Sequence, residues 1–278
     1  MPVDIDAAVI GNTRLSEDYS VLALAAPEIA TAARPGQFVM LKTARGMDPL
    51  LRRPFSIFEV LRHSDGSPRG ITILNKRIGT GTGLLYEIEA GARVQCLGPL
   101  GVPFEPAEAP AHAWMVAGGV GLAPFVTLAE ALIARGTPLT LFYGARRAVD
   151  LHCADIFERL EVPIVFSTED GSRGSRGFIT VPLEARLSAL TSSGKSSDDV
   201  RLYVCGPTPM MRAVADVAAR HSRRCDVSLE QVMGCGMGGC YSCVVPARDA
   251  TGAPHHTRSC IDGPVFDASR IVWDALAH

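Results

Sequence analysis

The chain has 278 residues, enough for about two domains, and 47% of them are hydrophobic, as is usual in a globular protein. Its formal net charge is −2 and the sequence contains no basic block, so nucleic acid is not expected as a partner. The first residues lack the pattern of a signal peptide, and the apolar runs are shorter than the roughly 20 residues that span a membrane. We therefore expect a cytoplasmic protein with no membrane partner.

Residues 1–106 contain several short runs of β-forming residues, separated by Gly and Pro. The clearest runs are residues 19–24, 37–41, 55–60 and 70–74. Many short strands with such turns are typical of a small barrel or sandwich.

Residues 107–226 alternate between strand and helix patterns. Apolar strands are predicted at residues 114–117, 139–143, 164–166 and 202–205, and a helix follows the last of them at residues 208–221. This alternation predicts a parallel sheet with helices on its faces.

Residues 227–278 form a short segment rich in glycine and cysteine. It is too small to build a strong hydrophobic core alone, so a metal centre would add the missing stability. Four of the eight cysteines lie here, namely Cys235, Cys240, Cys243 and Cys260.

These four cysteines follow the pattern C-x4-C-x2-C, and sixteen residues separate the third cysteine from the fourth. The spacing is that of plant-type [2Fe–2S] ligation, and the glycines between the first two cysteines allow the backbone to approach the sulfides. The alternatives are a structural zinc site, which also takes four cysteines, and free thiols. His255 and His256 lie between the third and fourth cysteines and are expected to be solvated loop residues.

Two segments of the β-rich region are candidates for binding phosphate. Arg53 begins the run Arg-Pro-Phe-Ser at residues 53–56, and its guanidinium can contact a cofactor pyrophosphate in a bidentate way. Residues 79–83 read Gly-Thr-Gly-Thr-Gly, and such small residues let backbone N–H groups reach a phosphate. The alternatives are a surface turn for the first segment and a hairpin or helix entry for the second.

Two further segments are candidates for binding a dinucleotide. Residues 118–124, Gly-Gly-Val-Gly-Leu-Ala-Pro, stand between a buried strand and a helix, although the G-x-G-x-x-G fingerprint is absent. Cys205 ends a later strand and is followed by Gly206 and Pro207, so its thiol is a candidate contact for a nicotinamide ring. The alternatives are a tight turn without a ligand and a small buried cysteine.

Together these motifs resemble the ferredoxin–NADP reductase superfamily, and within it the electron-transfer subunits of class 1B dihydroorotate dehydrogenases. The similarity runs over essentially the whole chain and includes residues 169–172, 228–236 and 260–266. The resemblance implies a multi-domain fold. Its expected parts are a flavin-binding antiparallel β-barrel at residues 1–106, an NAD-binding α/β domain with a parallel sheet at 107–226, and a small [2Fe–2S] domain at 227–278.

The resemblance also implies the cofactor contacts. FAD would be bound by Arg53, Pro54, Phe55, Ser56, Leu74, Asn75, Lys76, Gly81 and Thr82. NAD would be bound by Gly118, Gly119, Gly121, Pro124, Gly206, Pro207 and Met210. Asn75 departs from the family, which often has an aromatic residue there. Arg146 matches the family, which favours NAD over NADP.

The function implied is electron transfer between NAD and a [2Fe–2S] cluster through FAD. Cys205 and Glu230 are the candidate catalytic residues, although an exposed glutamate is usually only a solubilising charge. A barrel that oxidises dihydroorotate needs about 250 further residues. The resemblance therefore implies an FMN-containing catalytic subunit as partner, in a heterotetramer of two copies of each chain that serves pyrimidine (UMP) biosynthesis. The alternatives are a reductase of an oxygenase or hydrogenase system and a zinc-stabilised binding module.

Overall fold

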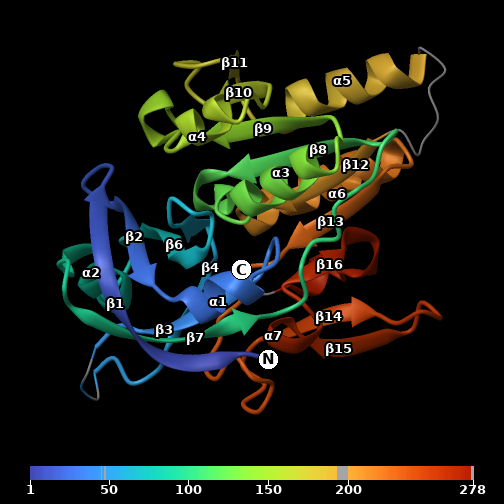
Figure 1. Ribbon diagram of the computed structural model, residues 1–278. Coiled ribbons are helices and arrows are strands. Elements are labelled where there is room, and N and C mark those ends of the chain that lie inside the picture. Colours follow the sequence, from blue (N-terminus) through green and yellow to red (C-terminus); the bar gives the residue numbers. More distant parts are fainter. Residues whose placement is uncertain (45, 47, 193–199, 277–278) are drawn as a thin grey trace. The chain divides into compact units, whose positions relative to one another are not determined.

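The computed structural model describes residues 1–44, 46, 48–192 and 200–276, and these residues form two compact units (Figure 1). The first unit contains residues 1–44, 46, 48–103, 231–244 and 258–264. The second contains residues 104–230, 245–257 and 265–278, apart from those outside the described ranges. No helix in the described part of the chain is long and apolar enough to cross a membrane.

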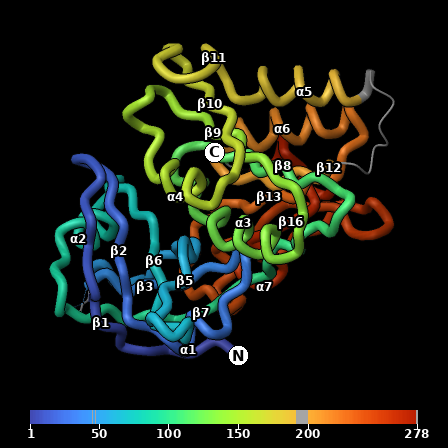
Figure 2. The backbone as a smooth tube through the Cα atoms, turned by 45° about the horizontal axis from the view of Figure 1, so that its top comes forward, coloured from blue at the N-terminus to red at the C-terminus, as the bar shows by residue number. Residues whose placement is uncertain are grey.

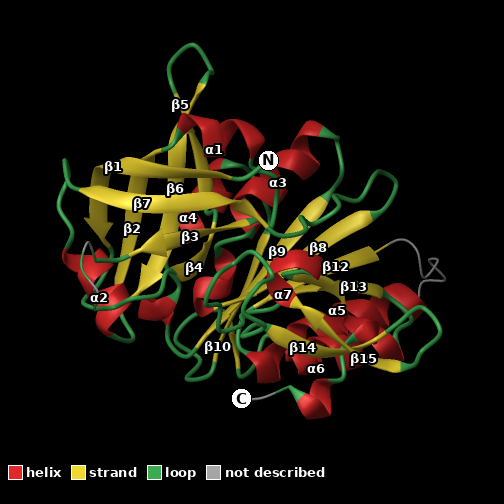
Figure 3. Ribbon diagram, turned by 90° about the horizontal axis from the view of Figure 1, so that it is seen from below, coloured by secondary structure: helices red, strands yellow, loops and turns green. Residues whose placement is uncertain are grey.

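The first unit is built on a curled antiparallel sheet of seven strands in the order β4-β3-β7-β1-β2-β6-β5 (Figure 3). The strands are β1 (Val3–Arg14), β2 (Tyr19–Ala25), β3 (Phe38–Lys42), β4 (Arg53–Ser56), β5 (Glu59–Arg62), β6 (Pro68–Lys76) and β7 (Arg93–Leu100). Helix α1 (Pro27–Ala32) follows β2, and helix α2 (Thr80–Glu87) lies against β2 and β6 (Figure 2).

Strand β3 is buried on both of its faces. Val39 and Leu41 point into the main core of the first unit. Phe38 and Met40 point the other way, into a second core cluster with Met233, Cys243 and Cys260. Successive side chains of a strand alternate between its faces, so one short apolar strand carries both cores. The loop that bears the cysteines is thereby packed against the outer face of this sheet.

The second unit is built on a seven-stranded sheet in the order β11-β10-β9-β8-β12-β13-β16. The strands are β8 (His112–Gly118), β9 (Leu139–Ala145), β10 (Ile164–Thr168), β11 (Ser175–Arg176), β12 (Val200–Cys205), β13 (Arg224–Ser228) and β16 (Val265–Asp267). All neighbouring strands are parallel except β13 and β16, which are antiparallel.

Helices cover both faces of this sheet. They are α3 (Phe125–Ala134), α4 (Ala154–Arg159), α5 (Thr180–Ser192) and α6 (Thr208–Arg220). Helices α5 and α6 lie side by side and share one core with Trp114, Val116 and Leu202 (Figure 2). Short 3-10 turns complete the unit: η1 (Gly119–Leu122), η2 (Ala148–Asp150), η4 (Ala268–Arg270) and η5 (Trp273–Ala275).

The remaining elements come from the last part of the chain. Strands β14 (Val244–Arg248) and β15 (Pro254–Arg258) form a two-stranded sheet of their own, and helix α7 (Ser259–Asp262) carries Cys260. His255 and His256 lie in β15, so the expectation that they are loop residues is wrong.

The predicted fold class is confirmed: an antiparallel sheet precedes a mainly parallel α/β sheet, and the cysteine-rich part comes last. By compactness the described residues divide into two units, and the three domains 1–106, 107–226 and 227–278 stay a prediction. Residues 231–244 and 258–264 belong to the first unit, and the rest of the predicted segment 227–278 belongs to the second. The physical reason is that so short a segment buries its apolar side chains only against a larger neighbour.

Candidate functional site

Arg53 opens strand β4, and its side chain is held by backbone carbonyls. Its Nη1 donates to the carbonyl oxygens of Leu51 at 2.9 Å and Arg52 at 3.2 Å. The neighbouring Arg52 is paired with Asp4 at 2.9 Å. Because a guanidinium has five N–H donors, Arg53 keeps donors with which to bind an anion such as a phosphate. Pro54, Phe55 and Ser56 continue β4 and are all partly exposed.

Helix α2 begins in the glycine-rich segment at residues 79–83, so the helix-entry interpretation of that segment is confirmed. Thr82 Oγ1 accepts hydrogen bonds from the N–H groups of Ile78 at 2.9 Å and Gly79 at 3.1 Å. The first N–H groups of any helix lack partners within the helix, which makes its start suited to an anion. An ideal Cβ on Gly81 would lie 3.5 Å from Arg53 Cγ. The helix start and the Arg53 side chain are therefore neighbours.

Asn75 is fully buried at the end of β6. Its side-chain amide donates to the carbonyl oxygen of Thr82 at 3.1 Å and to Ser20 Oγ at 3.4 Å. Its Oδ1 atom is buried with no hydrogen-bond partner in the described part of the chain. Asn75 thus ties the start of α2 to the sheet. Its neighbours Leu74 and Lys76 are buried and exposed, respectively.

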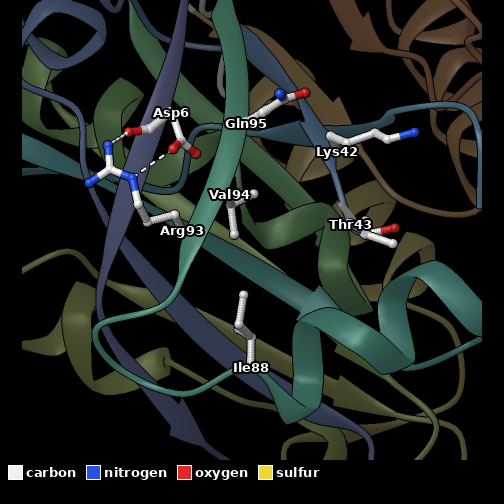
Figure 4. A pocket seen from close by; sticks show the side chains of 8 residues that line it. Asp6, Lys42, Thr43, Ile88, Arg93, Val94 and Gln95 are labelled. Carbon is white, nitrogen blue, oxygen red and sulfur yellow. Dashed lines mark hydrogen bonds and ion pairs between the residues drawn. The ribbon is translucent and has the colours of Figure 1, made fainter. Parts of the chain in front are cut away.

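A cavity of about 450 Å³ opens in the first unit between β3, β7 and the end of α2 (Figure 4). Lys42, Thr43 and Gln95 are among the residues that line it. Thr43 Oγ1 is buried without a partner among the described residues, and it would be 3.2 Å from an ideal Cβ on Gly81. The sequence pattern does not single out Thr43, since a threonine after a strand is common.

Three features of the first unit bear on the binding of a flavin dinucleotide. A fixed arginine, a helix start without a side chain at Gly81 and the unpartnered hydroxyl of Thr43 lie together. A pyrophosphate needs positive charge, close backbone N–H groups and hydrogen-bond donors. The residues present therefore fit the phosphate part of FAD.

The two predicted dinucleotide segments meet at the carboxyl ends of the neighbouring strands β8 and β12. Cys205 pairs with Ala117 in the sheet, and Gly118 and Gly206 follow these two residues. An ideal Cβ on Gly118 would lie 2.6 Å from Met210 Sδ and 3.0 Å from Pro207 Cδ. Gly119 has a φ of +56°, which favours glycine. Pro124 stands at the N-cap of α3, one residue before the helix.

The chain order reverses between these two strands, since β9 lies on the other side of β8. In open α/β sheets this reversal opens a crevice beyond the carboxyl ends of the strands, and ligands bind there. The predicted NAD segments thus lie where the topology provides a binding site. Arg147, which follows β9, is paired with Asp150 at 3.2 Å, and Arg146 is exposed.

Cys205 and Glu230, the two candidate catalytic residues, follow neighbouring strands. Cys205 ends β12 and is 2% exposed, and it pairs in the sheet with Ser228 at the end of β13. Burial raises the pKa of the Cys205 thiol well above its usual value, and the charge of Glu230 raises it further. Cys205 is therefore a neutral thiol in the folded protein. Glu230 is exposed and close enough to act on it.

The four predicted cluster ligands gather on one loop and on α7. Cys243 and Cys260 are buried against Phe38, Met40 and Leu100. The N–H of Ser259 donates to the carbonyl oxygen of Cys243 at 2.9 Å, which links the loop to α7. None of the eight cysteines, all of which the structure describes, forms a disulfide bond.

The backbone conformation of this loop requires glycine at two positions. Gly236 has a φ of +72°, and an ideal Cβ there would lie 2.6 Å from Met40 Cγ. Gly238 has a φ of +80°, and a Cβ there would lie 2.8 Å from Ile261 Cγ1. Side chains other than hydrogen at these positions would be strained and would collide with the sheet or with α7.

The electrostatics of the cysteines differ. Hydrogen bonds, first of all from the Ser242 side chain, lower the pKa of the Cys240 thiol to about 6. Burial, followed by the neighbouring Cys243, raises the pKa of the Cys260 thiol to about 12. A buried thiol of this kind ionises when a metal takes the place of its proton.

The set of donors fits an iron–sulfur cluster, because four thiolates are its usual ligands. Cys235 lies close enough to affect the pKa values of both Cys240 and Cys260, and Cys243 lies close enough to affect that of Cys260. Among the described residues no group of three or more His, Cys, Asp or Glu side chains is arranged to hold a single metal ion.

Comparisons with protein families identify two regions of the chain. The family described as the iron-sulfur cluster binding domain of dihydroorotate dehydrogenase B matches residues 230–272, which include all four cysteines. The family described as the oxidoreductase NAD-binding domain matches residues 115–216, from β8 into α6.

Similar proteins cover nearly the whole chain. The dihydroorotate dehydrogenase B (NAD(+)) electron transfer subunit of Desulforamulus reducens is 36% identical over 97% of this chain and 98% of its own length. The protein of the same name from Geobacillus kaustophilus is 37% identical over 93% of this chain and 94% of its own.

Solved structures agree in fold. A structure of an NADH-dependent reduced ferredoxin–NADP oxidoreductase matches with a TM-score of 0.81 and 26% identity, over 97% of this chain and 91% of that one. The ferredoxin reductase in carbazole 1,9a-dioxygenase matches with a TM-score of 0.63 and 23% identity, over 80% and 65%. The second likeness shows the fold alone.

Proposed function

This chain belongs to the family of dihydroorotate dehydrogenase B electron transfer subunits, and we propose that it carries electrons between NAD and the FMN of a catalytic subunit that oxidises dihydroorotate. It is an NAD-linked oxidoreductase subunit with the reductase fold, and its cofactors are FAD, a [2Fe–2S] cluster and NAD. The observation that carries the proposal is the 36% identity over 97% of the chain, together with the four gathered cysteines.

The partner in this proposal is a separate FMN-containing chain, and two copies of each chain form a heterotetramer in the cytoplasm. The two units of this chain are accounted for by flavin, dinucleotide and cluster residues. A (β/α)8 barrel for a pyrimidine needs about 250 further residues. The dihydroorotate chemistry therefore takes place on the partner, in the pathway that makes UMP.

We assign the FAD phosphates to Arg53, the start of α2 at Gly81 and Thr82, and the hydroxyl of Thr43. Asn75 positions α2 through the Thr82 carbonyl. The other proposed flavin contacts are Pro54, Phe55, Ser56, Leu74 and Lys76. The positive charge of Arg53 and the helix start offset the phosphate charge, and both are preorganised by bonds within the protein.

We assign NAD to the turns that follow β8 and β12. The proposed contacts are Gly118, Gly119, Gly121, Pro124, Gly206, Pro207 and Met210. In this assignment the glycine turns let the backbone approach the dinucleotide. Cys205, a neutral thiol, and Glu230 are the proposed contacts of the nicotinamide end.

Bound flavin supplies the chemistry that joins a two-electron hydride carrier to a one-electron cluster. The protein's task is to hold the groups at reacting distance and to keep water away. In this proposal the cluster is held by Cys235, Cys240, Cys243 and Cys260. The loop that bears these cysteines packs on Phe38 and Met40.

The proposal is tested by mixing the chain, loaded with FAD, iron and sulfide, with an FMN-containing dihydroorotate dehydrogenase catalytic subunit from the same source. Dihydroorotate-dependent formation of NADH, absent with either chain alone, is the expected result. A pair that does not associate and forms no NADH would contradict the proposal. Electron delivery by this chain to an oxygenase or hydrogenase component instead would establish the alternative reductase function.

A further inference from the structure

The hydroxyl of Ser242 lies between the backbone of Gly234 and the sulfur of Cys240. The Gly234 N–H donates to Ser242 Oγ at 2.8 Å, and this oxygen lies 3.1 Å from Cys240 Sγ. An ideal Cβ on Gly234 would be 3.2 Å from Cys240 Sγ and 3.4 Å from Ser242 Oγ. A side chain at residue 234 would therefore make a tight contact with the Cys240 sulfur and touch the Ser242 hydroxyl.

The position of the hydroxyl proton follows from these contacts. A serine hydroxyl has one proton to donate and two lone pairs to accept with. The Gly234 N–H uses a lone pair, so the proton remains for another partner. A cysteine that ligates iron is a thiolate and has no proton of its own. In the loaded protein the Ser242 O–H therefore donates to Cys240 Sγ.

We propose that Ser242 raises the reduction potential of the cluster by donating this hydrogen bond to Cys240. The inference rests on the proposed function, since it requires a [2Fe–2S] cluster on the four cysteines. Reduction adds one electron to the cluster and breaks no bond, and part of the added negative charge falls on the thiolate sulfurs. The O–H dipole stabilises that charge more in the reduced state than in the oxidised state. Ser242 is thus a positioning residue that acts through Cys240.

Backbone donors and this hydroxyl contribute in different ways. The N–H of Met237 donates to Cys235 Sγ at 3.4 Å, and such a backbone group survives any side-chain substitution. The Ser242 hydroxyl is removed by a single change. Because Cys240 and Ser242 are both exposed, water competes for the sulfur, and we expect a modest effect.

The test is a redox titration of the full chain loaded with FAD, iron and sulfide, followed by electron paramagnetic resonance of the reduced cluster. The Ser242→Ala variant should disfavour the reduced cluster about tenfold, which is about 59 mV for a one-electron couple. Ser242→Thr keeps the hydroxyl and should titrate like the wild type. Ser67→Ala removes an exposed serine hydroxyl that is bonded to Asp65, in a turn next to β6, and should also titrate like the wild type.

An unchanged potential in Ser242→Ala with full iron content would overturn the inference. If that variant does not retain iron, the isosteric pair Ser242→Thr and Ser242→Val replaces it, and equal potentials in that pair would be equally decisive against it. The wild-type chain distinguishes a failure of the proposed function from a failure of the inference about Ser242. A wild-type chain that assembles no cluster refutes the proposed function, whereas a normal cluster with a Ser242-independent potential refutes this inference alone.

Discussion

A Cβ atom on Gly121 would overlap the carbonyl oxygen of Cys205 and lie 2.5 Å from its carbonyl carbon. The turn after β8 therefore packs directly against the end of β12, with backbone facing backbone. This contact joins the two predicted dinucleotide segments, which are more than eighty residues apart in the sequence. The two turns can lie this close together only because residue 121 has no side chain.

Replacing Gly121 with Ala should raise the KM for NADH about tenfold or more. The added methyl forces the two turns apart, and overpacking of this kind costs about 1–3 kcal/mol. Steady-state reduction of ferricyanide by NADH measures the change. Gly11→Ala is the matched control, because a methyl there meets nothing within 4 Å. An unaltered KM in Gly121→Ala would remove these turns from the NAD site.

Replacing Arg53 with Ala should weaken FAD binding about tenfold to a hundredfold, because a hydrogen bond to a charged group contributes about 1.5–3 kcal/mol. Flavin retained after gel filtration, and titration of the apoprotein with FAD, measure the loss. Arg62→Ala serves as control, since that exposed arginine donates to the Gly66 carbonyl oxygen and lies outside the assigned FAD contacts. Full flavin content in Arg53→Ala would exclude the assigned role.

Replacing Thr43 with Val should separate cofactor binding from folding. The Thr43 hydroxyl has no partner among the described residues, so its removal should leave the free energy of unfolding of the apoprotein unchanged or raise it. FAD affinity should fall about tenfold if the hydroxyl binds the cofactor. Chemical unfolding of the apoprotein and FAD titration measure the two quantities. A destabilised apoprotein with normal FAD affinity would contradict the assignment, because the hydroxyl would then serve folding and not FAD binding.

Replacing Cys240 with Ala should abolish electron transfer to the partner subunit and leave flavin reduction by NADH intact. The reason is that Cys240 is an exposed proposed ligand of the cluster and belongs to none of the flavin segments. Stopped-flow measurement of flavin bleaching, with and without the partner, resolves the two steps. Cys153→Ala, at a cysteine outside the cluster loop, is the control. Partner reduction at the wild-type rate in Cys240→Ala would refute this order of transfer.

Much of the fold follows from local sequence patterns. The apolar runs at residues 114–117 and 202–205 lie in strands β8 and β12. Helices cover both faces of their sheet, and strands that are buried on both faces have continuous apolar sequences. The sequence pattern predicts one strand at residues 55–60, but the structure divides these residues between β4 and β5. Ile57 and Phe58 are buried between these strands, and burial alone does not reveal a break.

The site is predictable where spacing carries the chemistry. The C-x4-C-x2-C pattern gives the four cysteines without a structure. The packing of their loop on Phe38 and Met40 is not predictable, because a buried strand shows no sign of which neighbour covers each face. Thr43 and Ser242 are found only in three dimensions, where one hydroxyl lacks a partner and the other contacts a sulfur.

The most direct test of the account is the content of iron and acid-labile sulfide in the chain isolated without oxygen. Four cysteines that hold a [2Fe–2S] cluster predict about two iron atoms and two sulfides for each bound FAD. The account would be contradicted if the isolated protein carried its flavin but had zinc, or no metal, at these cysteines.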